Sequence, residues 1–326
     1  MVPGWFQFCS ESVSSVQVQS VCESLDQDRT QLVSFRGCLV SDQDFRRICE
    51  SVGRSRSLLQ LSLSLGLVSG QDRTNRTSDQ TRTRDQTRVT ELSRALDQNR
   101  SLHTLFLHGN ALSEPEVLVL TRSLLLHPAL LSLDLGDCSL SDRGLDQVCG
   151  LLPPNGAKPG LQELTLSSNP RISSSGWTRL CVSLAHSSQL QTLRLDYNPL
   201  GDAVAEMLAV AVASSRTLET LDLEGTELSE RSGQVFLDSL VLFPSSLKVL
   251  VLSENRISPE VQTQIQELLS EPEDEPIRAR RPLQRPIRER RLLQRPIRAK
   301  DRPHSGAHTV LLSSALGDSL LDETEM

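Results

Sequence analysis

The sequence has few aromatic residues. Only 7 Phe, 2 Trp and 1 Tyr occur in 326 residues, whereas leucine occurs 58 times. A compact core normally mixes apolar side chains of different shapes, because interlocking shapes fill space. A core made almost entirely of leucine indicates one packing unit used many times. The sequence therefore predicts internal repeats.

Long apolar runs and targeting signals are also missing. No run approaches about 18 consecutive apolar residues, so the sequence predicts no transmembrane helix. The start, MVPGWFQFCSESVSS, has no basic stretch followed by an apolar one, so we expect no secretory signal. The 7 cysteines are an odd number, and without export they are expected to be reduced thiols. These absences favour a cytoplasmic protein, with the nucleus as an alternative.

Motifs that carry catalysis are missing as well. The sequence contains no G-x-S-x-G, no G-x-x-x-x-G-K-[ST] and no H-E-x-x-H. Its 6 histidines form no nucleophile–base pattern, and no C-x-x-C pair suggests zinc. We expect no enzyme, no cofactor and no metal site.

One pattern recurs along the chain, L-x-x-L-x-L-x-x-N/C-x-L. Six copies begin at 102, 130, 161, 190, 218 and 247, and two degenerate copies begin at 30 and 58. A half-copy, Phe6-x-Phe8, is expected to cap the start. In this pattern the L-x-L forms a short parallel strand with its leucines inward. The Asn or Cys turns the chain, and its side chain can satisfy backbone groups that the turn buries.

The spacing of the copies leaves room for a helix after each strand. Copies lie 28 to 31 residues apart, except for one gap of 44, and the pattern predicts helices over 115–126, 142–152, 176–186, 202–214, 230–243 and 259–270. Ser or Asp precedes several of them, as helix caps do. We predict an α/β fold: a right-handed leucine-rich repeat solenoid, or horseshoe, over 1–270. Parallel strands line its concave side and helices its convex side, in about eight repeats plus the N-terminal half-repeat cap.

The period and helix pattern resemble the ribonuclease-inhibitor-like subclass of leucine-rich repeat proteins, which is also seen in NOD-like receptors. Six segments are similar to one family of this group well beyond the generic repeat: 35–49, 105–112, 127–142, 150–170, 195–226 and 317–326. This resemblance implies the solenoid fold and an intracellular setting, and no particular activity.

Three segments depart from the repeat. Residues 69–88 are almost free of apolar side chains, so we expect a flexible insertion there. Residues 271–303 start acidic and then repeat an Arg/Pro decapeptide; 276–303 carries 11 basic and 2 acidic residues, a net of +9, and we expect disorder. This basic stretch is a candidate nuclear-localisation or nucleic-acid patch, a plain solvated tail, or a segment that folds back onto an acidic face. Residues 304–326 hold a candidate short linear motif.

The cysteines fit the repeat better than they fit metal ligation. Cys38 and Cys138 fall at the turn position. Four others fall at one equivalent helix position, where they are expected to form a ladder of small buried side chains: Cys22, Cys49, Cys149 and Cys181.

The concave face is the informative surface. Side chains alternate along a strand, so positions between and after the inward leucines point to the open side. The candidate partner-binding residues are Phe106, His108, Asp134, Asp137, Glu163, Arg194, Asp196, Tyr197, Asp222, Glu224 and Glu254. Seven carboxylates against one Arg predict an acidic face, on which Phe106 and Tyr197 are candidate aromatic anchors.

These features predict a non-enzymatic intracellular scaffold or adaptor for protein–protein interaction. We expect a protein partner with a basic patch, no membrane association and a monomeric chain. Two alternatives remain. One is a regulator of a small GTPase that acts through the solenoid surface, like the repeat domain of Ran-activating proteins. The other is a nucleic-acid-binding or nuclear-targeting role of the basic tail.

Overall fold

The computed structural model describes residues 4–69, 79–152 and 160–270, with the side chains of 79–87 left aside. The chain divides into a unit of Met1–Glu273 and a second unit of Asp274–Met326. The fold described below is that of the first unit. The segments 271–303 and 304–326, and residues 70–78 of the expected insertion, lie outside the described residues.

Strands and helices alternate along the described chain. The strands are β1 Gly4–Cys9, β2 Thr30–Arg36, β3 Gln60–Ser64, β4 Thr104–Phe106, β5 Ser132–Asp134, β6 Glu163–Thr165, β7 Thr192–Arg194, β8 Thr220–Asp222 and β9 Val249–Val251. The helices are α1 Ser15–Asp26, α2 Asp42–Arg54, α3 Asp79–Gln98, α4 Glu114–Leu125, α5 Asp142–Cys149, α6 Ser174–His186, α7 Gly201–Ser214, α8 Glu230–Leu242 and α9 Pro259–Ser270.

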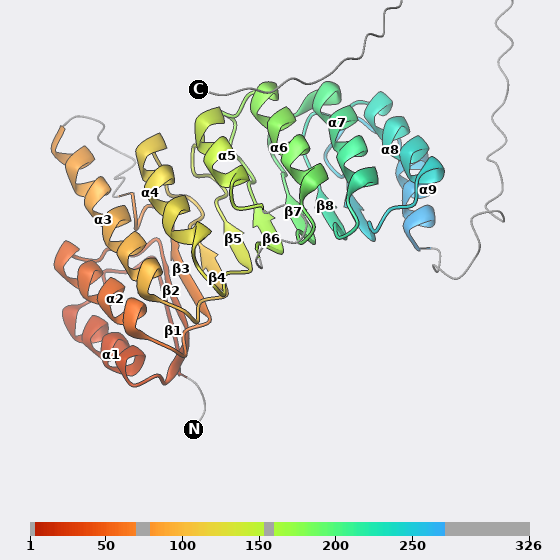
Figure 1. Cartoon of the computed structure of the whole chain (residues 1–326). Coiled ribbons are helices and arrows are strands. Elements are labelled where there is room, and N and C mark those ends of the chain that lie inside the picture. The colour runs from red at the N-terminus through yellow and green to blue at the C-terminus, as the bar shows by residue number, and fades with distance from the viewer. Residues whose placement is uncertain (1–3, 70–78, 153–159, 271–326) are drawn as a thin grey trace, which may run out of the picture. The chain divides into compact units, whose positions relative to one another are not determined.

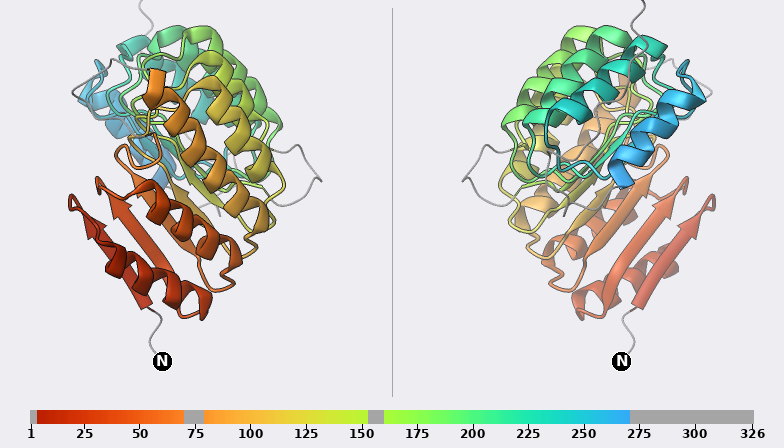
Figure 2. Two further views of the ribbon diagram at one scale, coloured as in Figure 1. Left: turned by 90° about the vertical axis from the view of Figure 1, so that its left-hand side faces the viewer. Right: turned by 90° about the vertical axis from the view of Figure 1, so that its right-hand side faces the viewer.

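The strands form one sheet in chain order, β1 to β9, and every neighbouring pair is parallel. The register keeps equivalent repeat positions side by side, as in Leu193↔Leu221 and Leu221↔Leu250. Figures 1 and 2 show the strands following a curve, with the helices stacked along one face. Each helix packs on the helices before and after it in the chain. The predicted leucine-rich repeat solenoid is confirmed.

The inward leucines build one continuous core. Leu105, Leu133, Leu164 and Leu193 are equivalent strand positions, and all are buried. Because neighbouring layers present the same side chain, each leucine meets a similar surface on both sides. The uniform composition of the core follows from this repetition.

The N-terminal cap is larger than expected. Phe6 and Phe8 pack against the core, and the ring of Phe8 stacks on that of Phe35 with centroids 5.1 Å apart. A full helix, α1, follows β1, so the N-terminal cap contains both the strand and the helix of a repeat.

The insertion predicted to be flexible over 69–88 overlaps the first part of α3, which begins at Asp79. The last residue of the predicted insertion, Arg88, is held in place by its guanidinium, which donates to Asp42 Oδ1 at 2.7 Å and to the carbonyl of Leu67 at 2.6 Å. The same group lies 5.1 Å from the ring centroid of Phe45. Burial of Arg88 by partners distant in the sequence offsets the shortage of apolar side chains.

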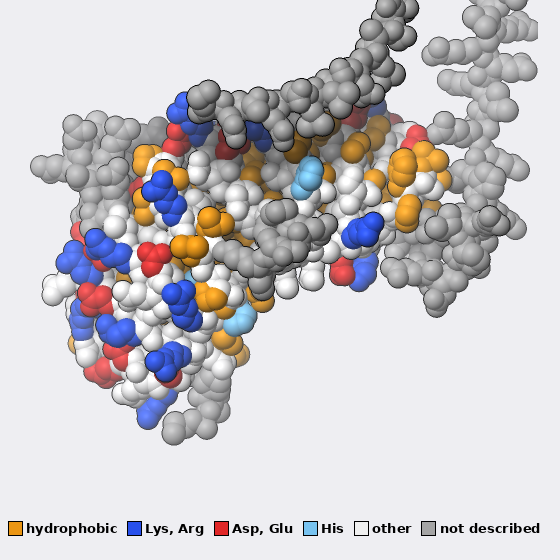
Figure 3. All heavy atoms as spheres, in the orientation of Figure 1, with side chains coloured by type: hydrophobic (Ala, Val, Ile, Leu, Met, Phe, Trp, Pro, Cys, Tyr) orange, Lys and Arg blue, Asp and Glu red, His pale blue; other side chains and the backbone are white. Residues whose placement is uncertain are grey.

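The surface over the helices changes character along the solenoid. Figure 3 shows Lys and Arg interspersed with Asp and Glu over α1 to α3. Ion pairs account for this mixture, among them Arg54–Asp26 at 3.0 Å and Arg94–Glu91 at 3.0 Å. At the other end, apolar side chains lie exposed near α8 and α9, where Leu242 and Phe243 are 70% and 54% exposed.

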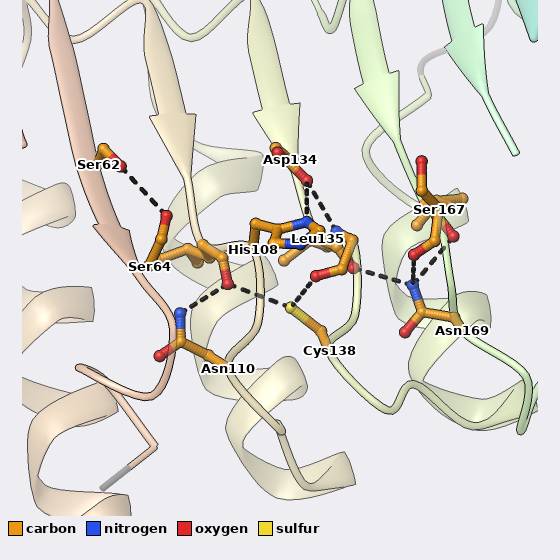
Figure 4. A network of polar contacts seen from close by, with 12 residues as sticks. Ser62, Ser64, His108, Asn110, Asp134, Leu135, Cys138, Ser167 and Asn169 are labelled. Carbon is orange, nitrogen blue, oxygen red and sulfur yellow. Dashed lines mark hydrogen bonds and ion pairs between the residues drawn. The ribbon is translucent and has the colours of Figure 1, made fainter. Parts of the chain in front are cut away.

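Buried asparagines hold the turns between strands and helices. Asn198 Nδ2 donates to the carbonyls of Leu166 at 3.0 Å and Leu195 at 2.8 Å, while its Oδ1 accepts the N–H of Asn169 at 2.6 Å. Asn169 and Asn110 form equivalent bonds, and Cys138 donates through its thiol to the carbonyl of Leu107 (Figure 4). The predicted role of the Asn or Cys is confirmed, because these side chains satisfy backbone groups that have lost contact with water.

The helix cysteines are free thiols set against the core. Cys22, Cys49 and Cys181 are buried as predicted, whereas Cys149 is only half-buried. Burial raises the pKa of all four thiols, that of Cys181 to about 12. A raised pKa keeps the thiol neutral and poorly nucleophilic, which fits a packing role.

A buried histidine makes the fold sensitive to mild acid. Burial, with Arg100 and His103 nearby, lowers the pKa of His127 to about 4. Between pH 6.5 and 4 the unfolded chain binds a proton that the folded chain excludes, so stability falls as the pH falls through this window. We expect the free energy of unfolding to drop by about 1 kcal/mol more in the wild type than in His127→Gln between pH 7 and 4.5, after allowing for solvent screening. Urea denaturation at both pH values tests this; equal drops would contradict it.

Candidate interaction surface

The side of the sheet away from the helices, called the open face here, is built from outward-pointing strand positions. Parallel pairing aligns these positions into columns. The first column is Trp5, Leu32, Gln60, Thr104, Ser132, Glu163, Thr192, Thr220 and Val249. The one shift in register between β1 and β2 lies just before it, between Gly4 and Trp5. The second column is Gln7, Ser34, Ser62, Phe106, Asp134, Thr165, Arg194, Asp222 and Val251.

The sequence-predicted residues lie on the strands and the turns that follow them. Five occupy strands: Phe106, Asp134, Glu163, Arg194 and Asp222. Six follow the strands directly: His108, Asp137, Asp196, Tyr197, Glu224 and Glu254. None of the eleven is buried, and direct neighbours include Phe106↔Asp134 and Arg194↔Asp222. The five strand residues therefore lie on the side of the sheet opposite the inward leucines, and the other six lie in the turns that follow the strands.

One equivalent position adopts a left-handed backbone in the turn after every strand, β1 to β9. Its members are Ser10, Gly37, Leu65, Gly109, Asp137, Ser168, Tyr197, Gly225 and Glu254, with φ between 48° and 74°. Only glycine adopts this conformation without strain, so the other residues are held there by the surrounding turn. This turn column forms the border of the open face.

Tyr197 lies across the next repeat. A Cβ added at Gly225 would come within 2.8 Å of Tyr197 Cδ1, so the ring rests on a surface that only glycine leaves free. The hydroxyl donates to Glu224 Oε1 at 3.0 Å, and the side chain is still 54% exposed. Leu65 covers Gly109 in the same way, with 2.7 Å from the added Cβ to its Cδ2. Tyr197 is thus a fixed yet accessible aromatic side chain.

Carboxylates crowd around Tyr197. Burial raises the pKa of Asp222, and the nearby charges of Asp196 and Glu224 raise it further, while Arg194 acts in the opposite direction. Across residues 4–69, 79–152 and 160–270, the ion pairs include none made by Asp196, Asp222 or Glu224. The cluster therefore keeps a net negative charge, which Arg194 opposes only in part and which a further cation would relieve.

The N-terminal part of the open face has a different chemistry, which sequence reasoning missed. Trp5 is 69% exposed in the first column, beside the half-buried Leu32. Ser34 and Ser62 follow in the second column, and Arg36 ends β2. The N-terminal end of the face is therefore partly apolar with one Arg, whereas the carboxylates lie further along, on β5 to β8 and in the turns that follow the strands. Strand register would have located these residues, but the first two copies are degenerate and gave no clear alignment.

A histidine–carboxylate pair lies near the middle of the open face. His108 Nδ1 is 3.9 Å from Asp134 Oδ1, and Figure 4 shows the imidazole turned toward this carboxylate. A Cβ added at Gly136 would lie 2.6 Å from His108 Nδ1, so glycine leaves the room that the ring occupies. The contact with Asp134 raises the pKa of His108, and Asp137 adds to the shift while Arg36 opposes it.

This pair predicts a measurable titration. A raised pKa in the folded state means that the protonated pair stabilises the fold below pH about 6.5, and that this contribution is lost as the pH rises through the folded pKa. We expect the pKa of His108 to fall in Asp134→Asn, because the main cause of the shift is removed. NMR titration of the imidazole C–H signals measures this, with His103 as an internal reference. An unchanged His108 titration would contradict the prediction.

Across 4–69, 79–152 and 160–270, no group of three or more His, Cys, Asp or Glu side chains is arranged to hold a metal ion. None of the helices in this part of the chain is long and apolar enough to span a bilayer.

Comparison with known proteins agrees with the repeat architecture. A family model described as Leucine Rich repeat matches residues 127–149. Leucine-rich repeat-containing protein 73 from Homo sapiens and Rattus norvegicus is 48% identical over 338 aligned positions, which cover 100% of both chains. Ribonuclease inhibitor from Sus scrofa is 30% identical over 49% of this chain and 35% of its own length.

The solved structures add support for the fold. One chain of the Rad7 and Elc1 complex in yeast matches 78% of this chain and 58% of its own length, with a TM-score of 0.53 and 16% identity. At this identity the likeness concerns the fold alone. Leucine-rich repeat solenoids generally present an extended surface to protein partners.

Proposed function

Since this chain belongs to the leucine-rich repeat-containing protein 73 family, we propose that it is a non-enzymatic protein-interaction module that binds its partner on the open face. The observation that carries the proposal is the crowded carboxylate cluster beside Tyr197, which has a raised pKa at Asp222 and no ion pair among the described residues. Rigid repeats hold these groups in place before any partner arrives, which lowers the entropy cost of binding.

The partner should carry a basic patch. Bringing a cation next to Asp196, Asp222 and Glu224 relieves their mutual repulsion, so the attraction supplies both affinity and orientation. Arginine suits this role best, because its planar guanidinium bonds carboxylates in pairs and stacks on an aromatic ring. Tyr197 provides that ring at the edge of the cluster.

The N-terminal end of the open face would contact a second part of the partner. Trp5 and Leu32 offer apolar surface, and Phe106 lies in the second column beside Asp134. Aromatic side chains surrounded by polar groups are frequent centres of binding energy. A partner with an apolar region beside its basic patch therefore fits the whole face.

Charge reversal on the open face tests this proposal. In cells that carry a proximity-labelling fusion, we expect Asp222→Lys to lose a defined set of labelled proteins that wild type retains. Purified members of that set should bind wild type with a Kd that rises with salt and that is at least tenfold higher for Asp222→Lys, because a close charge pair is replaced by repulsion.

A matched control separates the face from the overall charge. Glu50→Lys makes the same charge change at an exposed position of α2, on the helical side. It should retain the labelled set and the Kd of wild type. Equal losses in both variants, or no loss in Asp222→Lys, would contradict binding on the open face.

A further inference from the structure

The sheet is open at its N-terminal edge, where β1 is the first strand. Within the described residues β1 pairs with β2 alone. Phe6 and Phe8 on its inward side are half-buried, whereas their partners in β2, Val33 and Phe35, have no exposed surface. Figure 1 shows β1 and α1 together at this end of the solenoid. An edge strand whose apolar side is incompletely covered is a template for pairing with another chain.

The unpaired backbone groups of β1 follow from the hydrogen bonds of the other strands. Outward residues use both backbone groups to bond the repeat before them. The N–H of Thr104 donates to the carbonyl of Leu59, and in the next repeat the carbonyl of Asp134 accepts the N–H of Leu107. These directions alternate along a strand. Since no described strand precedes β1, its open edge carries the N–H and carbonyl groups of its outward residues, Trp5, Gln7 and Cys9.

The edge formed by these groups is complementary to itself. In an antiparallel pair, residues directly opposite each other exchange both bonds when their N–H and carbonyl groups face one another. A two-fold axis beside Gln7 sets this residue opposite its own copy, and Trp5 opposite Cys9 of the second copy. Every edge-facing group then has a partner. On the inward side the same register sets Phe6 opposite Phe8 of the second copy, where a pair of aromatic rings stabilises a sheet.

The outer flank of α1 continues this surface without charge. The flank toward α2 is identified by contacts such as that of Arg54 with Asp26 at 3.0 Å. The opposite flank consists of residues three and four positions apart on one face of the helix, Gln17, Ser20 and Ser24. It lies over β1, since a Cβ added at Gly4 would be 3.6 Å from Ser24 Oγ. Because β1, GWFQFC, has no charged residue either, two copies can meet here without like charges facing each other.

We propose that two copies of this chain associate through β1, in antiparallel orientation about a two-fold axis. The sheet then continues from one copy into the other, with the helices of both copies on the same side. A two-fold contact uses the same edge of both chains and closes on itself, so it forms a dimer rather than a fibre. Such a dimer differs from the monomeric chain expected from the sequence.

The size of this end sets the expected strength of the dimer. β1 has 6 residues and α1 has 12, so strand and helix are both about 20 Å long. A contact of this length, two layers deep, lies near the lower limit of stable interfaces, about 1,200 Å² in total. We therefore expect a reversible dimer with a Kd on the order of micromolar.

Sedimentation velocity of the full-length chain tests the dimer. Between about 1 and 100 μM we expect the wild type to change from mostly monomer to mostly dimer. Gln7 is exposed, and Gln7→Lys should raise the dimer Kd about tenfold or more, because like charges then lie opposite each other at the two-fold axis. Ser34→Lys is the matched control, since it adds the same charge at the neighbouring position of β2 and should dimerise as the wild type does.

Two results of this experiment would overturn the proposal. A wild type that stays monomeric at about 100 μM would leave the edge to a different protein. A dimer that Gln7→Lys does not weaken, or assembly beyond the dimer, would show that the copies meet through another surface.

Directed cross-linking tests the register. Gln7→Cys, combined with Cys9→Ser to remove the native thiol of β1, should form a disulfide between copies under mild oxidation. Opposite residues of a bonded antiparallel pair have Cα atoms about 5.5 Å apart, within the range that a disulfide spans. Ser34→Cys/Cys9→Ser is the control, since its copy would lie three strand spacings away, roughly 14 Å. We expect about tenfold less cross-linked dimer in this control; equal yields would overturn the proposed pairing.

Self-association through β1 can be told apart from partner binding at the carboxylates. Asp222 lies in β8, at the other end of the strand order from β1. Asp222→Lys should therefore retain the dimer Kd of the wild type, whether or not it loses labelled proteins. Loss of the dimer in Asp222→Lys would assign the self-contact to the open face and overturn pairing through β1.

Discussion

Asn198→Ala should lower the free energy of unfolding by about 3–5 kcal/mol, the largest effect we expect from one substitution. Asn198 is buried, and its amide bonds four backbone groups: the carbonyls of Leu166 and Leu195, more weakly that of Asp196 at 3.4 Å, and the N–H of Asn169. Alanine removes these bonds and leaves the buried backbone groups without a hydrogen-bond partner. Each unsatisfied buried group costs about 1–3 kcal/mol, and partial relaxation of the turn reduces the sum. Urea denaturation measures this loss in the free energy of unfolding, provided that its dependence on urea concentration, the m value, is unchanged.

The chain provides its own controls for this substitution. The repeat position that Asn198 holds is taken by Cys138 in one repeat and by Thr226 in another. Each of these side chains donates to a backbone carbonyl, Cys138 to that of Leu107 and Thr226 to that of Leu223. Asn198→Thr should therefore cost less than Asn198→Ala, on the order of 2 kcal/mol, since one carbonyl bond is kept. If alanine and threonine were equally destabilising, hydrogen bonding would not be the cause.

Gly225→Ala should cost about 2–3 kcal/mol, which is the second large effect. The left-handed backbone, with φ at 61°, contributes about 1 kcal/mol of strain for any residue with a Cβ. The rest of the expected loss in stability comes from a steric clash. The added Cβ would lie 2.8 Å from the ring of Tyr197 and would displace the ring. Denaturation gives the cost, and a change in tyrosine fluorescence reports the displaced ring.

Gly201→Ala is the control that separates backbone strain from the steric clash with Tyr197. Gly201 has a similar φ of 68°, but nothing lies within 4 Å of an added Cβ, so about 1 kcal/mol is expected. In a Tyr197→Ala background, Gly225→Ala should also fall to about 1 kcal/mol, because the clashing ring is gone. Additive effects of the two substitutions would contradict the contact between Tyr197 and Gly225.

Sequence reasoning succeeded where a repeat position determines the outcome. Leucine spacing located the strands, and the turn Asn and Cys were expected to bond backbone groups, as Asn198 and Cys138 do. Phe106 and Asp134, predicted only as members of the outward set, are direct neighbours in the sheet, as are Arg194 and Asp222. These features depend on periodicity, which one sequence displays fully.

Sequence reasoning did not predict the features that depend on contacts between segments distant in the chain. The start of α3 contains few apolar residues, and its anchor Arg88 is stabilised by Asp42 and by the carbonyls of Val40 and Leu67, which no local pattern reveals. The packing of the Tyr197 ring on Gly225 depends on left-handed backbone conformations at equivalent turn positions of two adjacent repeats. Propensity rules treat such turns separately and cannot predict their contact.

The packing of each helix on its neighbours in the chain has a mechanical consequence. A force that pulls the two ends of the solenoid apart acts on one layer boundary at a time, because within 4–69, 79–152 and 160–270 the helices contact mainly the helix before and the helix after them. We expect the protein to lengthen in steps, each releasing one repeat of about 28 residues and roughly 100 Å of chain. Resistance would be set by the weakest boundary rather than by the whole domain, which makes such a chain an extensible tether.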